Sequence, residues 1–159
     1  MKIDCTIDGK TLTLNLNSNK PLSLILQENI VTESANGICN GHMCGLCAVL
    51  MEGRAVLSCM VPAFEIRGKE IITFDSFRKT RDMKDIEKAY DLTGYHPCRR
   101  CYASRSIIIQ SLMNQGLVDK NDIKRELSAV RCTCMTAEEA VDIVQRANEI
   151  RRRKNARKS

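Results

Sequence analysis

Cysteine constrains this chain more than any other residue type, because eight of its nine cysteines fall into two sets of four. The first set has the spacing C-x4-C-x2-C-x11-C, and the second has C-x2-C followed about thirty residues later by C-x-C. Thiols stay reduced in a chain without an export signal, so clustered cysteines favour metal binding over a disulfide framework. The first set comprises Cys39, Cys44, Cys47 and Cys59, and the second comprises Cys98, Cys101, Cys132 and Cys134.

The first set matches the plant-type [2Fe-2S] ferredoxin pattern. A tight loop can present three thiolates to one cluster while a strand brings the fourth from farther along the chain. Gly37, Gly41 and Gly45 suit such a loop, because glycine adopts the tight backbone turns that aim N–H groups at the sulfur atoms. We therefore expect an iron–sulfur site here, with zinc as the main alternative.

The second set lies at the starts of two predicted helices, where the helix dipole stabilises thiolates and metal-bound sulfur. Its spacing alone indicates zinc about as readily as an iron–sulfur cluster. The ninth cysteine, Cys5, belongs to neither set. It falls at an inward position of a predicted strand, so we expect a small core residue there.

Residues 1–76 predict a small, strand-rich α+β unit. Apolar residues alternate on both sides of Asp8-Gly9, and this dipeptide is typical of a type I′ hairpin turn. A short apolar helix is expected over 22–29. Further strands are expected over 48–51, 55–60 and 69–74.

Residues 82–153 predict an all-α unit, and 154–159 form a basic tail that we expect to fray. Thr136 followed by two acidic residues is a typical helix start, and Gly116 is typical of a position just past a helix end. The expected helices cover 82–92, 104–115, 121–127 and 136–153.

The net charge of +6 is confined to the end of the chain. Residues 151–159 contain six basic side chains and no acidic one, so residues 1–150 are formally neutral. A neutral body argues against a nucleic-acid-binding face, although the basic tail over 151–159 could contact an acidic partner.

Several function classes are disfavoured by what the sequence lacks. No apolar run approaches the ~18 residues of a membrane-spanning helix, and the first residues do not read as a secretory signal. We therefore expect a cytoplasmic protein. Neither a Ser-His-Asp set nor a phosphate loop stands out, so we expect no catalytic residue on this chain.

Taken together, the order of the two cysteine sets and the two halves resembles the small iron–sulfur subunit of molybdenum hydroxylases. This family includes xanthine dehydrogenase, aldehyde oxidoreductase and aerobic carbon monoxide dehydrogenase. The resemblance spans residues 3–147, and all eight clustered cysteines fall on the family's ligand positions. The stretches that carry it are ICNGHMCGLCAVLMEGRAVLSC (38–59), RGKEIITFDSF (67–77) and AVRCTCMTAEEAVDIVQRA (129–147).

The resemblance implies a fold and a role. Residues 1–76 would form a plant-ferredoxin-like β-grasp domain, and 82–153 would form a four-helix [2Fe-2S] domain. The two clusters would relay electrons from a large molybdopterin-containing catalytic subunit to FAD in a medium subunit. The second cysteine set would lie nearer the pterin and the first set nearer the FAD.

The sequence departs from the family pattern around the second cysteine set. Pro97 stands where the family usually has Gln, Tyr102 to Ser104 replace Thr-Pro-Gly, and Met135 to Ala137 replace Thr-Gly-Tyr. Because the family uses that Gln and its neighbours to touch the pterin, we hypothesise a divergent large subunit. Arg99 and Arg100, inside the C-x2-C, either favour the reduced cluster by their charge or are simply solvated or in contact with a partner.

Overall fold

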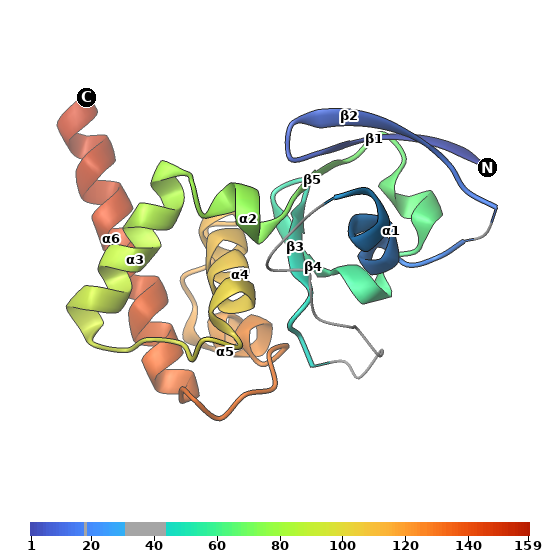
Figure 1. The fold of residues 1–159 in the computed structure, drawn as a ribbon. Coiled ribbons are helices and arrows are strands. Elements are labelled where there is room, and N and C mark those ends of the chain that lie inside the picture. The colour runs from blue at the N-terminus through green and yellow to red at the C-terminus, as the bar shows by residue number, and fades with distance from the viewer. Residues whose placement is uncertain (18, 31–43) are drawn as a thin grey trace.

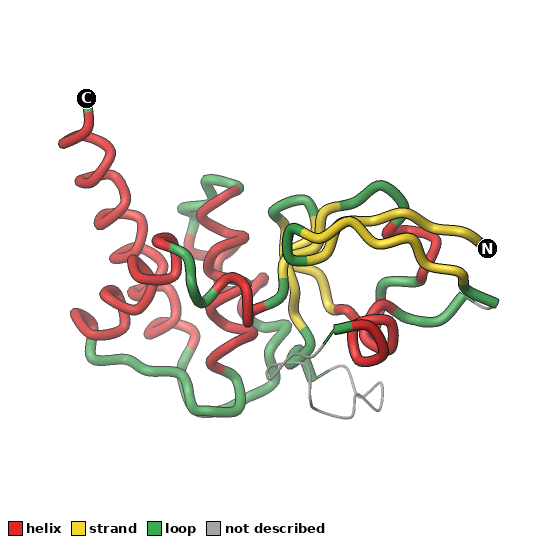
Figure 2. Tube along the Cα trace, turned by 45° about the horizontal axis from the view of Figure 1, so that its top comes forward, coloured by secondary structure: helices red, strands yellow, loops and turns green. Residues whose placement is uncertain are grey.

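The computed structural model describes residues 1–17, 19–30 and 44–159, and it places a five-stranded sheet beside a group of helices (Figure 1). The helices lie on one side of the molecule and the strands with α1 on the other, with the two chain ends far apart (Figure 2). The sheet order is β2-β1-β5-β3-β4. The strands are β1 (Lys2–Ile7), β2 (Lys10–Asn15), β3 (Ala48–Met51), β4 (Arg54–Leu57) and β5 (Glu70–Ile72).

Two hairpins with left-handed turns build most of the sheet. Asp8 has φ +50° and Gly9 has φ +78°, as a type I′ turn requires, so the predicted hairpin is confirmed. Glu52 and Gly53 repeat this geometry between β3 and β4, with φ +52° and +78°. The backbone N–H of Thr73 donates to the Asp8 carboxylate at 2.8 Å, which ties the first turn to the end of β5.

The sheet is buried on both faces at β3, because successive side chains of a strand point to opposite faces. Val49 packs into a core with α1 (Leu22–Asn29) and the short 3-10 helix η2 (Ala63–Ile66). Ala48 and Leu50 pack into a second core with the helices. Cys5 is 3% exposed within the first of these cores, so its predicted place in a core is confirmed.

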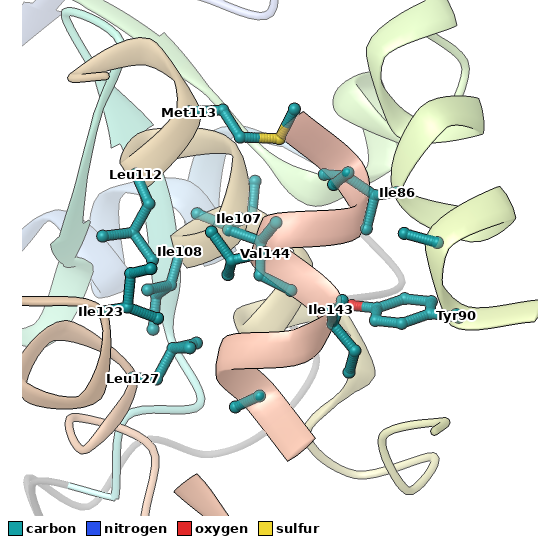
Figure 3. Packing of buried hydrophobic residues seen from close by; sticks show 14 of the residues in the cluster. Ile86, Tyr90, Ile107, Ile108, Leu112, Met113, Ile123, Leu127, Ile143 and Val144 are labelled. Carbon is teal, nitrogen blue, oxygen red and sulfur yellow. The ribbon is translucent and has the colours of Figure 1, made fainter. Parts of the chain in front are cut away.

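The helical half follows the predicted segments closely. The short helix α2 (Phe74–Phe77) leads into it from β5. The four longer helices are α3 (Arg81–Thr93), α4 (Tyr102–Asn114), α5 (Lys120–Leu127) and α6 (Ala137–Lys158). Helix α4 is central and is buried all round from Ser104 to Met113. Figure 3 shows Ile107 and Ile108 of α4 beside Val144 of α6 and Leu127 of α5.

A row of polar side chains on α4 holds the β3–β4 hairpin. Ser111 Oγ accepts a hydrogen bond from the Ala55 backbone N–H at 2.8 Å, and Asn114 Nδ2 donates to the Gly53 carbonyl at 2.8 Å. Because β4 is an edge strand, these contacts cover backbone groups that would otherwise face solvent. The strand expected over 55–60 ends at Leu57 and continues as the 3-10 helix η1 (Ser58–Met60).

Helix α6 runs to Lys158 instead of ending near residue 153, because its basic residues have acidic partners on α3. Asp85 is only 4% exposed, and both Lys154 Nζ and Arg151 Nε form ion pairs with its carboxylate. Arg151 Nη2 also lies 3.3 Å from Asp82 Oδ1. None of the helices formed by the described residues combines the length and apolar character that crossing a bilayer requires.

These ion pairs predict that part of the basic end is structural. Replacing both Arg151 and Lys154 by alanine leaves the buried Asp85 without a cation, which we expect to cost about 2 kcal/mol. The apparent melting temperature should then fall by about 4–8 °C. Arg152 and Arg153 are exposed, so alanine at both removes the same charge and should change the melting temperature by at most about 2 °C. If both double substitutions lower the melting temperature equally, the ion pairs with Asp85 do not stabilise the fold.

Candidate metal centre

The four cysteines of the second set come together near the starts of α4 and α6. The Sγ atoms of its four members all lie within 4.8 Å of one another. Cys101 Sγ is 3.2 Å from Cys134 Sγ, and Cys98 Sγ is 3.6 Å from Cys132 Sγ. All four are free thiols. Thiolate sets of this kind bind zinc or iron–sulfur clusters, so the site fits the group predicted from its spacing.

Two helix starts position these cysteines. Cys101 is the N-cap of α4, and its backbone N–H donates to the Cys98 carbonyl at 3.1 Å, which closes a tight turn between the two thiols. The other pair precedes α6, whose N-cap Thr136 forms a capping box with Glu139. The capping box fixes the start of α6 after Cys134, so the C-x-C segment lies outside the helix and includes a turn at Thr133 and Cys134.

The surroundings of the thiols differ sharply. Cys101 is fully buried, and this burial raises the pKa of its thiol. The pKa of Cys98 is lowered, mainly by a hydrogen bond from the Cys101 backbone N–H and to a smaller extent by one from the Cys101 thiol. Cys134 is exposed. Because a bound metal requires thiolates, loading of this site releases protons and is expected to strengthen as the pH rises.

Two members of the first set, Cys47 and Cys59, lie at the same end of the β3–β4 hairpin, and Cys44 precedes Cys47 in the chain. Among the described residues, only the second set has its thiols gathered closely enough to hold a metal. Ala48 pairs with Leu57 in the register, so Cys47 lies immediately before β3 while η1 carries Cys59 just after β4. The Ser58 N–H donates to the Cys47 carbonyl at 3.0 Å, which holds the two segments together. Cys44, Cys47 and Cys59 are all partly buried. Cys39, Gly37 and Gly41 lie outside the described residues.

The two cysteine-bearing regions touch through their backbones. The Arg131 N–H donates to the Cys44 carbonyl at 3.0 Å. Gly45 has φ +80°, and a Cβ atom there would lie 2.0 Å from the Ala129 carbonyl oxygen. Glycine is therefore required by both the backbone conformation and the close approach of the segment that leads to Cys132.

Comparison with known proteins decides the family. No protein-family model matches the chain. The xanthine dehydrogenase iron-sulfur-binding subunit of Escherichia coli O157:H7 is 30% identical to it over 135 residues, which cover 83% of this chain and 84% of the relative. The chain belongs to this family of iron–sulfur subunits. One subunit of the nicotinate dehydrogenase of Pseudomonas putida is 26% identical over 153 residues, covering 95% of this chain and 97% of the relative.

Solved structures share the fold of this family member over nearly its whole length. Quinoline 2-oxidoreductase from Pseudomonas putida 86 gives a TM-score of 0.70 at 22% identity, with 96% of each chain covered. Aldehyde oxidoreductase from Desulfovibrio gigas gives 0.77 at 19% identity, with 97% of this chain and 17% of that longer chain covered. The predicted mixed α+β fold and the resemblance to the xanthine dehydrogenase family are confirmed.

The residues that depart from the family pattern mostly make contacts within this chain. Tyr102 packs edge-on against Phe74, with ring centroids 5.9 Å apart. The buried Ser104 Oγ accepts a hydrogen bond from the Ala48 N–H at 3.4 Å. Pro97 and Met135 are buried as well. These residues therefore contribute to packing within this chain, in addition to any effect at a partner surface.

Sequence reasoning singled out Arg99 and Arg100 but passed over Arg105. The first two are exposed, whereas Arg105 is 4% exposed and donates from Nη2 to the Cys132 carbonyl at 3.2 Å. The signal in the sequence was a positively charged residue inside a predicted apolar helix, one turn after a cysteine of the second set.

Proposed function

We propose that the chain is an electron-transfer subunit that carries two [2Fe-2S] clusters. The observation that carries the proposal is the convergence of the second cysteine set, in a chain related to an iron-sulfur-binding subunit. A cluster bound at either set would supply one-electron transfer. One cluster would be held by Cys39, Cys44, Cys47 and Cys59, and the other by Cys98, Cys101, Cys132 and Cys134.

The chain's own residues control access to the second site. Full burial of Cys101 and near-complete burial of Met135 exclude water from its inner side. The exposed Cys134 marks the outer side, from which a redox partner can approach. This arrangement suits a centre that must be shielded from solvent yet reached by another protein.

The contact between the two cysteine regions supports an internal relay. A hydrogen bond from the Arg131 N–H to the Cys44 carbonyl joins the backbone next to Cys132 to the backbone of the first set. Gly45 lets the two segments approach closely. The proposed centres would thus be held at a fixed separation by the protein's own packing.

The proposal extends to domains and partners. Residues 1–76 would be a plant-ferredoxin-like β-grasp domain, and 82–153 a four-helix [2Fe-2S] domain followed by the basic end over 154–159. The partners would be a medium subunit that binds FAD and a large catalytic subunit, which is either of the molybdopterin type or divergent. Electrons would pass between them through this chain in the reducing cytoplasm.

Metal analysis of the purified full-length chain, alone and with its co-purifying subunits, tests the function. We expect a red-brown protein with about four irons per chain and, after dithionite reduction, two distinguishable EPR signals. A colourless protein that contains zinc and gives no EPR signal would instead identify a zinc-stabilised interaction module. Binding to acidic partners that is lost at high salt and on deletion of 151–159 would support the tail-mediated alternative.

A further inference from the structure

A buried arginine lies beside the second cysteine set, with no acidic partner among the residues that the structure describes. Arg105 occupies the first turn of α4 and is 4% exposed. None of the ion pairs formed by the described residues includes it. An arginine stays charged in proteins, and an isolated charge at such a depth is costly unless a negative group compensates it.

The polar contacts of Arg105 go to cysteines from both segments of the site. Its Nη2 donates to the Cys132 carbonyl at 3.2 Å. Its backbone N–H donates to the Cys101 carbonyl at 2.9 Å. The Nε–H is buried and has no acceptor among the described residues. The missing negative partner of this cation is therefore expected at the cysteine set itself.

We propose that Arg105 is a positioning residue that raises the reduction potential of the second cluster. The inference rests on the proposed function, since an oxidised [2Fe-2S] cluster with four thiolates carries a charge of about −2 and reduction adds one electron. No bond forms or breaks in this step. The buried guanidinium stabilises the additional negative charge more than it stabilises the oxidised state, because little water screens it.

Arg99, which precedes α4, provides a matched comparison for Arg105. It lies between Cys98 and Cys101 but is exposed, so water and salt screen its charge. Removing the charge of Arg99 should therefore affect the cluster far less than removing that of Arg105. Comparing the two variants shows whether the potential of the cluster depends on the burial of the charge or only on its proximity.

A dithionite titration of the full-length chain, followed by EPR, tests the proposal on the wild type and on R105M, R105Q, R105K and R99M. We expect R105M and R105Q to lower the equilibrium constant for reducing the second centre at least tenfold, which is 59 mV for one electron. The first centre should keep its wild-type value. R105K should recover most of the loss, and R99M should change the constant less than threefold.

Each outcome either supports or refutes the role proposed for Arg105. An assembled second centre with wild-type potential in R105M or R105Q would overturn the proposal. If neither neutral variant assembles that centre, assembly in R105K alone supports the need for a cation, and failure in R105K too rejects it. A wild-type chain without EPR signals would refute the proposed function instead, and the two failures are thus distinct.

Discussion

The Gly45→Ala variant is expected to break the close contact between Gly45 and the segment that leads to Cys132. The added Cβ would lie 2.0 Å from the Ala129 carbonyl oxygen and 2.7 Å from the Val130 Cα. No side-chain rotation can relieve an overlap with backbone atoms, so the two segments must separate. We expect a loss of roughly 3–5 kcal/mol of folding free energy, combining overpacking with left-handed strain. The melting temperature should fall by roughly 10 °C or more.

Gly94 supplies the matched control for this substitution. It also has a positive φ, +74°, but no atom lies within 4 Å of the Cβ position. Gly94→Ala should therefore show only the conformational strain of roughly 1 kcal/mol. Thermal unfolding of both variants, together with their iron content, provides the measurement. Similar losses in the two variants would mean that the contact with Ala129 contributes nothing.

Replacing Cys134 by alanine is expected to remove one of the two proposed metal centres. Cys134 Sγ lies 3.2 Å from Cys101 Sγ, and its side chain is exposed, so the substitution removes a proposed ligand with little loss of packing. Iron should fall from about four to about two per chain, and one of the two EPR signals should disappear. The lost signal identifies the second centre for the titrations of Arg105.

The same variant should also unfold more readily. The proposed centre joins the start of α4 to the segment before α6, and metal binding of this kind contributes directly to folding free energy. Cys5→Ala serves as the control, because Cys5 lies in the core of the sheet half and belongs to neither set. It should keep both EPR signals and all of the iron. Loss of iron in Cys5→Ala, or full retention in Cys134→Ala, would contradict the assignment of ligands.

Local sequence signals predict which elements form better than they predict where those elements end. The helix over 22–29 and the turn at Asp8-Gly9 follow from apolar spacing and from glycine's freedom to adopt positive φ, and both are present. The strand expected over 55–60 ends at Leu57, because the chain enters the 3-10 helix η1 at Ser58. The end of α6 was placed too early, because its pairing with Asp85 links residues far apart in sequence.

The sequence by itself determined which cysteines form sets, where most helices lie and to which family the chain is similar, because ligand spacing and helix periodicity are local properties. Only the tertiary structure placed the Cys98–Cys101 turn against the segment that carries Cys132 and Cys134. It alone revealed the buried charge of Arg105 and the close approach at Gly45. These features arise from contacts between distant segments, and the burial that gives them their energetic weight exists only once α4 is enclosed by the sheet and the other helices.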